Sequence, residues 1–512
     1  MSEQLEGLLR ELQALEIIYE QGLLPEPAYI FKHAVIQDVA YNSLLMQSRK
    51  VVHRAVGEAI EDLYQDRLEE HYAELAHHFS QAEVWEKAFL YWQHAGARAF
   101  ARSALREAMA CFEQALTALP RVPENQAQRE QAIDLRLDMR NVLIALGDFR
   151  RMFALLSEAE TLAQALEDQH RLGWVSAYLN PYFSNLGNQD RAIETGQRAL
   201  TIARASGDFA LEMMATFFLG LPYISLGDYQ QAAHYHRGNV EALTGAWRHE
   251  RFGEPGLPSV FCRAYLAWSL AELGEFVEGL VCGAEAVQLA KTVDQPFTLS
   301  HAYFGLGMLH LRKGDFQPAI AALEQSLHIC QTGDVQLILP WAASSLGYVY
   351  ALSGRLWEAL PLLEQAVEQS ARMQQMTYYP LWMAHLSEAY LLSGLLEDAH
   401  QRAEQALALS RDYKQRGYEA HALRLLGEVA AHRDPLEVEP AEAFYRQALT
   451  LADELGMRPL LAHCHFGLGI LYNRIGRPEQ AHAELSVAIE LYRTMDMTFW
   501  LERAEAVLVQ IA

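Results

Sequence analysis

The sequence predicts an all-α protein, a right-handed superhelical solenoid of helical hairpins, and three observations support this expectation. A turn-like glycine recurs about every 40 residues along most of the chain. Apolar and small residues before and after each glycine follow intervals of three and four, which place them on one face of a helix. A fixed period of roughly 20 to 50 residues is typical of repeat proteins, in which each unit buries its apolar face against the next.

The recurring glycine is expected to end one helix and let the chain reverse, because glycine adopts the left-handed backbone conformation without strain. An acidic residue often follows it, where its oxygen can accept from the free N–H groups of the next helix. The glycines are Gly147, Gly187, Gly227, Gly274, Gly314, Gly354, Gly394 and Gly476, and Arg433-Asp434-Pro435 marks one further turn.

A small residue lies seven or eight positions before most of these turns. In the middle of a helix a glycine costs about 1 kcal/mol relative to alanine. We therefore expect these positions to let the paired helix of each hairpin approach closely. They are Gly220, Ala267, Gly307, Gly347, Ser387, Gly427 and Gly469.

Composition limits the classes of function. The chain is 51% hydrophobic and 21% charged, enough apolar material for an extended core. Its formal net charge of −24 disfavours nucleic acid and anionic membrane surfaces, both of which bind cationic proteins. A basic or apolar partner is electrostatically easier, although such a charge can also serve only solubility.

Cysteine usage and the N-terminal sequence favour a cytoplasmic protein. The five cysteines are scattered and form no C-x-x-C pair, which is typical of small core residues in a reducing compartment. The first residues lack the basic and apolar segments of a secretory signal. No apolar stretch approaches the ~20 residues that span a bilayer, so no membrane interaction is expected.

The repeat resembles the tetratricopeptide repeat. The match is carried by Trp92-x2-Ala95-Gly96, Ala108-x3-Phe112, Ala115 and Pro120, and by the small residue, turn glycine and alanine-anchored second helix of the later units. The resemblance covers residues 84–512 and implies a superhelical array with a concave binding groove. The period of about 40 exceeds the usual ~34 and implies longer helices or loops.

One interval, from Gly227 to Gly274, is about seven residues longer than the others. The extra residues fall in a stretch that combines aromatic and basic side chains with glycines, and insertions in solenoids often map to the working face. A neutral insertion is the alternative. The candidate residues of this insertion loop are Trp247, Arg248, Arg251 and Phe252.

The first 83 residues differ from the rest. A helix-spaced leucine pattern precedes alternating β-branched and aromatic residues around a Gly/Pro turn at residues 22–27, which indicates a short hairpin. Residues 1–32 are therefore interpreted as a winged-helix-like remnant. Residues 33–83 are interpreted as a helical linker or arm that leads into the repeats.

The stretch from Tyr29 to Leu45 resembles a junction in multidomain signal-transduction ATPases and class III adenylate cyclase-related proteins, where it connects the nucleotide-binding module to repeats. Residues 74–79, 86–96 and 354–367 and the ending Met497-Thr-Phe-Trp-Leu are similar to the same family. The resemblance implies that this chain is the C-terminal repeat arm of such an architecture.

No catalytic, cofactor or metal site is expected. The sequence holds no Gly-Lys dipeptide and hence no phosphate-binding loop, and no Gly-x-Ser-x-Gly elbow. His71, His77 and His78, and His463 with His465, are close in sequence but lack a completing ligand set. They are interpreted as ordinary helix histidines.

One face of each first helix is expected to line the groove. Aromatic side chains along it could hold an extended or helical peptide, or could instead pack between repeats. The candidate residues are Trp174, Phe217, Trp268, Phe304, Tyr348, Arg424 and Phe466.

The sequence thus predicts a non-catalytic scaffold or sensor arm that binds a protein or peptide, with a signalling ATPase or cyclase as one possible partner. Two alternatives stay open. The chain could belong to a larger ATP-binding or adenylate cyclase-type enzyme, or it could sense a small ligand or signalling peptide. Self-association is also possible, because terminal repeats often expose a stacking face.

Overall fold

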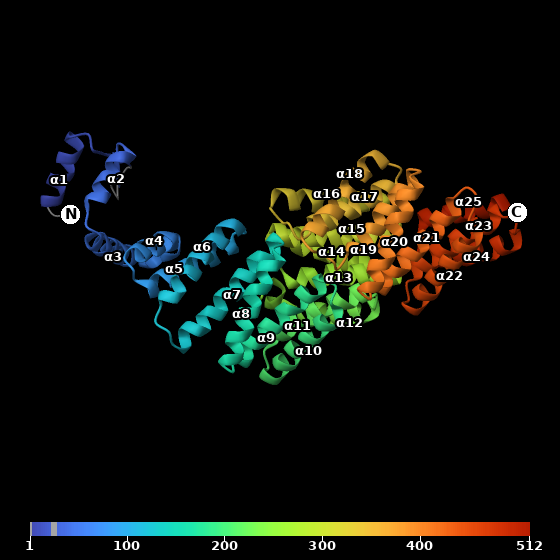
Figure 1. Cartoon of the computed structure of the whole chain (residues 1–512), viewed down its shortest axis with the longest axis horizontal. Coiled ribbons are helices and arrows are strands. Elements are labelled where there is room, and N and C mark those ends of the chain that lie inside the picture. Colours follow the sequence, from blue (N-terminus) through green and yellow to red (C-terminus); the bar gives the residue numbers. More distant parts are fainter. Residues whose placement is uncertain (1–2, 22–27, 512) are drawn as a thin grey trace. The chain divides into compact units, whose positions relative to one another are not determined.

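The computed structural model describes residues 3–21 and 28–511. The chain forms two compact units, one of residues 1–99 with 110–128 and one of residues 100–109 with 129–512. The predicted turn at residues 22–27 lies outside the described residues. The two units are described separately (Figure 1).

The first unit begins with the helix, hairpin and helix that the sequence predicts. Strands β1 and β2 pair antiparallel, with Ile18 opposite Phe31. Further on, Phe79, Leu75 and Tyr91 form a small buried core. The elements up to Arg121, of which residues 100–109 belong to the second unit, are α1 (Glu3–Ala14), β1 (Ile18–Gln21), β2 (Ala28–Phe31), α2 (Ala34–Ser43), α3 (Met46–Leu63), a 3-10 helix (Gln65–His71), α4 (Tyr72–Gln81), α5 (Trp85–Ala101), α6 (Leu105–Ala118) and a short 3-10 turn (Leu119–Arg121).

The second unit is a solenoid of successive helical hairpins, and the predicted fold class is confirmed (Figure 1). Helix lengths of 14 to 21 residues account for the long period. In each hairpin we call the odd-numbered helix the first helix and the even-numbered one the second. The helices are α7 (Gln126–Leu146), α8 (Phe149–Ala165), α9 (Gln169–Asn185), α10 (Gln189–Ser206), α11 (Phe209–Leu226), α12 (Tyr229–Ala242), α13 (Pro258–Leu273), α14 (Phe276–Val293), α15 (Pro296–Lys313), α16 (Phe316–Thr332), α17 (Leu339–Leu352), α18 (Leu356–Arg372), α19 (Tyr379–Leu392), α20 (Leu396–Asp412), α21 (Arg416–His432), α22 (Val438–Glu454), α23 (Arg458–Arg474), α24 (Pro478–Thr494) and α25 (Thr498–Ile511).

The small residues have the predicted role. A Cβ added to Gly307 of α15 would lie 2.6 Å from Leu323 of α16, and one on Gly347 of α17 would lie 2.8 Å from Leu363 of α18. The turn glycine is also confirmed, since Gly314 has φ +93°. Asp148 caps the helix that follows its turn by accepting from the backbone N–H of Arg151 at 3.1 Å.

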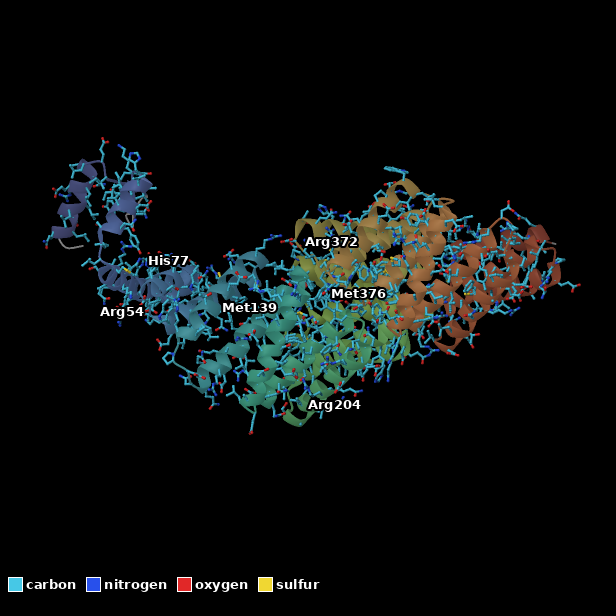
Figure 2. The ribbon with its side chains drawn as sticks, viewed as in Figure 1. Arg54, His77, Met139, Arg204, Arg372 and Met376 are labelled. Carbon is cyan, nitrogen blue, oxygen red and sulfur yellow. The ribbon has the colours of Figure 1, made fainter. Side chains whose placement is uncertain are left out.

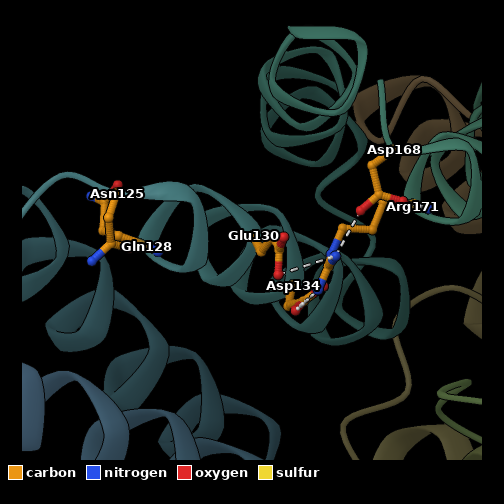
Figure 3. Close-up of polar contacts among 6 residues, drawn as sticks. All are labelled: Asn125, Gln128, Glu130, Asp134, Asp168 and Arg171. Atoms are coloured by element: carbon orange, nitrogen blue, oxygen red, sulfur yellow. Dashed lines mark hydrogen bonds and ion pairs between the residues drawn. The ribbon is translucent and has the colours of Figure 1, made fainter. Parts of the chain in front are cut away.

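An ion-pair cluster joins the first two hairpins (Figure 3). Arg171 at the start of α9 donates to both carboxylate oxygens of Asp134 on α7, each at 2.7 Å, and to Asp168 at 2.7 Å. Asp168 also caps α9 by accepting from the backbone N–H of Arg171. Burial opposes the charge of Asp168, but these bonds outweigh it and lower the pKa of the carboxyl. The cluster fixes α9 against α7 through charge-assisted bonds.

The first helices form the interior of the solenoid. Met139 of α7 is fully buried and Met376 is half-buried, whereas the side chains of Arg204 and Arg372 are about two thirds exposed (Figure 2). Helices distant in sequence also meet here, because α11 contacts α21 and α13 contacts α23. Successive turns of the superhelix are therefore stacked on one another, and α13 is buried along its whole length.

Helix α11 alone, among the described helices, is long and apolar enough to cross a membrane by length and composition. Of its apolar stretch, 67% is buried inside the solenoid. Contact with neighbouring hairpins explains this composition, because a helix that is apolar all round is typical of the core of a large protein.

The insertion loop is anchored by a buried ion pair. It contains a 3-10 helix (Gly245–His249) and ends at Pro258, where α13 begins. Glu254 in this loop accepts from Arg140 of α7 at 2.6 Å, and both side chains are almost completely buried. Arg140 also lies 3.9 Å above the ring of Tyr178. The loop before the fourth hairpin is thus fastened to the first.

We expect Glu254→Gln to lower the free energy of unfolding by about 3 to 5 kcal/mol, because it leaves the buried Arg140 guanidinium without its counter-charge. Chemical denaturation of the full chain measures this loss. The matched control is Glu278→Gln, which breaks an exposed pair with Arg237 and should cost less than about 1 kcal/mol. Equal effects of the two substitutions would contradict the structural role of the buried pair.

Buried histidines make stability depend on pH. His236 is fully buried beside Gly220 and Tyr265, and burial lowers its pKa to about 3. Burial also lowers the pKa of His301 to about 4, although a bond to the carbonyl of Phe297 opposes the shift. Both pKa values lie below the unfolded value near ~6.5, so their contribution to stability is complete above that pH and is lost on acidification.

For each of these two histidines, the free energy of unfolding should fall by about 2 kcal/mol when the pH falls from about 7 to about 5. His236→Leu should remove one such contribution and flatten the pH dependence of the free energy of unfolding. The matched control is His328→Leu, which removes a histidine that is exposed on α16. An unchanged slope in the His236 variant would show that this side chain does not titrate on unfolding.

Candidate partner-binding groove

A groove of about 720 Å³ opens between the first helices of the last hairpins and α25. It forms where the C-terminal ends of α17, α19, α21 and α23 converge, beside one face of α25. We call this the C-terminal groove. Its lining residues are Tyr348, Ala351, Leu352, Gly354, Leu356, Glu388, Leu392, Arg424, Glu428, Ala431, His432, Tyr445, His463, Phe466, Gly467, Ile470, Arg474, Trp500, Arg503, Ala506 and Val507.

The 40-residue period brings the polar floor of this groove together. Tyr348, Glu388 and Glu428 each follow the small residue of their first helix, so they occupy the same position in three consecutive hairpins. Arg424 lies one helical turn before Glu428, close to both carboxylates. Side chains at one repeated position therefore meet across neighbouring helices.

Arg424 joins the two carboxylates of the floor. Its guanidinium donates to Glu388 and, at 2.5 Å, to Glu428, while the Tyr348 hydroxyl donates to Glu388 at 2.9 Å. Tyr348 in turn stacks on His385, with ring centroids 4.0 Å apart. The floor is thus a connected hydrogen-bond network that holds its side chains in fixed positions.

Burial and charge set the ionisation of the floor. Burial opposes the charge of Arg424, but Glu388 and Glu428 outweigh it and raise its pKa. Burial raises the pKa of Glu428, although Arg424 opposes the shift. His463 at the side of the groove has its pKa lowered by burial and by Arg424. At neutral pH this histidine is uncharged and donates or accepts a neutral hydrogen bond.

Apolar side chains and two arginines form the walls. Phe466 and Ile470 of α23 are half-buried and Leu392 of α19 is 47% exposed. Within the described residues, Arg474 and Arg503 have no carboxylate in ion-pair contact. Arg474 donates instead to the carbonyl of Ala431, and Arg503 lies over the ring of Phe499 at 5.1 Å. The groove therefore offers apolar contacts next to accessible cationic groups.

The structure separates the residues that the sequence singled out. Tyr348, Arg424 and Phe466 all line the C-terminal groove. Phe217, Trp268 and Phe304 are at least 96% buried, because stacked superhelical turns cover their part of the concave face. Trp174 is half-buried against Tyr178, with ring centroids 5.6 Å apart, and lies outside the groove.

Phe217 borders a small interior cavity of about 70 Å³ lined by aromatic rings. Ser184 and Asn185 border it too, and among the described residues the Ser184 Oγ and the Asn185 Nδ2 have no hydrogen-bond partner. A buried water needs roughly 10 to 15 Å³ of such space, so the cavity suits a few water molecules better than an organic ligand.

The insertion-loop candidates have different surroundings. Trp247 is 47% exposed, while Phe252 is buried and stacks on it with ring centroids 5.8 Å apart. Arg251 donates to the carbonyls of Glu254 and Pro255, at 3.1 and 2.8 Å. Arg248 borders a second surface groove of about 700 Å³ over α14. Arg251 thus stabilises the loop itself, and Trp247 and Arg248 face outward.

Sequence reasoning missed several groove residues. Glu388, Glu428 and Ile470 could have been found, because each follows a small residue that the repeat pattern had already identified. Trp500 and Arg503 carry no such signal, because the neighbours of α25 are set by the curvature of the solenoid. Arg474 lies near a turn, where a cation is typical of the C-terminal end of any helix, so its position gave no sign of a groove.

Comparisons with known proteins agree with the fold. A family model described as tetratricopeptide repeat matches residues 300–331, which fall on α15 and α16. No curated protein sequence matches the chain. A Rap protein solved in complex with Competence and Sporulation Factor is similar over 72% of this chain and 98% of its own, with 18% identity and a TM-score of 0.54. That likeness shows a shared helical fold.

Two further solved structures are similar over much of the chain. The Rap conjugation gene regulator of plasmid pLS20, in complex with the Phr* peptide, aligns with 71% of this chain and 96% of its own at 16% identity and a TM-score of 0.43. A signal transduction ATPase with numerous domains from Pyrococcus horikoshii, which has a tetratricopeptide repeat sensor, aligns with 88% of this chain and 60% of its own at 14% identity and a TM-score of 0.33.

Proposed function

We propose that this chain is a non-catalytic scaffold or sensor that binds a protein or peptide segment in the C-terminal groove. The groove itself is the observation that carries the proposal, because it combines a fixed polar floor with apolar walls and two accessible arginines. Concave, mostly apolar sites with a few placed polar groups are typical of ligand binding. The Rap protein of the same fold, solved with Competence and Sporulation Factor, supports a solenoid of this kind as a holder of partners.

The sequence resemblance supports a role for this binding within a multidomain signalling system. The junction at residues 29–45 is similar to the one that precedes repeats in signalling ATPases and adenylate cyclase-related proteins. On this proposal residues 1–32 derive from a winged-helix unit, residues 33–83 form an arm, and residues 84–512 bind the partner in the cytoplasm. The repeat array would then either sense the state of a signalling ATPase or cyclase or transmit partner binding to it.

The proposal predicts that peptides selected from a displayed random library on the full chain bind through the groove. Ile470→Glu places a charge among the apolar walls and should weaken a selected peptide at least tenfold, about 1.4 kcal/mol. Fluorescence anisotropy with the labelled peptide measures this change. Circular dichroism of the variant checks that the helical fold is retained.

Val277→Glu is the matched control, because Val277 is 84% exposed on α14 and lies outside the groove. Peptide affinity should be unchanged in that variant. Selected peptides that bind the Ile470 variant as well as the natural chain would place binding elsewhere. A library that yields no binding peptide would count against peptide recognition altogether.

A further inference from the structure

The stacked superhelical turns show how the solenoid recognises peptide segments within its own chain. The turn glycine of each of the first five hairpins, Gly147 through Gly314, is covered by a side chain from far along the sequence. The loop that connects two later hairpins supplies most of these contacts. The covering side chains, in order, are Met373, Tyr413, Leu455, Met495 and Trp500. All five are large and mostly apolar, although at Gly227 the backbone of Gly417 lies closer than Leu455, at 2.6 Å against 3.2 Å.

Backbone hydrogen bonds hold two later loops against these turns, and the second of these loops also carries Met373. The Gln336 N–H donates to the carbonyl of Ala145 at 3.1 Å, and the Met376 N–H donates to the carbonyl of Asn185 at 2.8 Å. Ala145 and Asn185 each lie two residues before a turn glycine, Gly147 and Gly187. The same acceptor position is thus used in both hairpins.

Three later turn glycines, Gly354, Gly394 and Gly476, have no described atom covering them; Gly354 lines the C-terminal groove, and Gly394 lies two residues after Leu392, which lines it too. Gly354 and Gly394 keep positive φ values of 80° and 78°, and no described atom lies within 4 Å of a Cβ placed on either. The equivalent acceptors are the carbonyls of Leu352 and Leu392. Within residues 3–21 and 28–511, no N–H donates to either carbonyl. We call Gly354, Gly394 and these two leucines the open turns.

The sequence of the open turns differs from that of the covered ones. Most covered turns place an acidic residue after the glycine, as Asp148 does. The open turns place Arg355 and Leu395 there. Leu392 and Leu395 are also 47% and 44% exposed, so apolar surface replaces the capping acid.

The open turns also adjoin the proposed binding site. Gly354, Leu352 and Leu392 line the C-terminal groove. A segment held in the groove therefore lies beside residues that occupy the same repeat positions as the covered turns at Gly147 and Gly187.

From this continuity we infer that the open turns bind an extended segment of a partner protein that carries a methionine or aromatic side chain. In the register of Met373 and Met376, which serve Gly147 and the carbonyl of Asn185, its large side chain covers Gly354 and a backbone N–H three residues later donates to the carbonyl of Leu392. The inference rests on the proposed function and names the chemistry that the C-terminal groove recognises. Adding a chain to unpaired backbone acceptors gives affinity, while the covered glycine gives specificity.

A synthetic peptide that copies residues 369–380 is the probe, because it contains Met373 and Met376, the side chain and the N–H that serve at Gly147 and Gly187. Labelled with a fluorophore, it should bind the full chain in an anisotropy titration. Met373→Glu in the peptide should weaken binding at least tenfold. N-methylation at Met376, which removes the donor, should weaken it several-fold.

The protein variant Leu392→Glu should also weaken the probe at least tenfold, while Val277→Glu on α14 should leave its affinity unchanged. Equal binding to both variants, or no loss on N-methylation, would overturn the inference. So would failure of the probe to bind at all while a library-selected peptide still loses affinity in the Ile470→Glu variant. In that last case the proposed function stands and only the assigned chemistry fails.

Discussion

Close approach of the two helices in each hairpin is the constraint on which the rest of the structure depends. Gly307, Gly347 and Gly469 leave no room for a side chain beyond hydrogen, because a leucine of the paired helix occupies that space. A larger residue would push the helices apart and alter their angle. Since each hairpin packs on the next, such a change would accumulate along the solenoid.

Because the hairpin geometry is constant, one superhelical turn packs against another. This stacking determines which surfaces of the solenoid are buried and which are exposed. Where turns stack, the concave face becomes core. Glu272 there pairs with Arg312 at 2.7 Å, and although burial opposes its charge, Arg312 and His421 lower its pKa to about 2. In the later hairpins the same face lines the C-terminal groove. The same repeated position is thus buried core in the earlier hairpins and groove lining in the later ones.

The sequence alone predicts the repeat well and the site only in part. Periodic glycines and small residues report local geometry, so the hairpins and their close contacts follow directly. The number of hairpins in a superhelical turn depends on small rotations between units, which leave no local signal. For that reason Trp268 and Tyr348, one residue after Ala267 and Gly347, carry the same pattern although only Tyr348 borders the groove. The buried pair of Arg140 and Glu254 was likewise invisible, because 114 residues separate them.

The pair of Arg140 and Glu254 affects how the protein unfolds. A solenoid held only by neighbouring units behaves as a one-dimensional chain and can fray from either end. Here the bond between Arg140 and Glu254, and the contacts of α11 with α21 and of α13 with α23, join units that are several hairpins apart. Loss of one hairpin therefore removes support from another far along the chain, and the array gains the cooperativity of a globular domain.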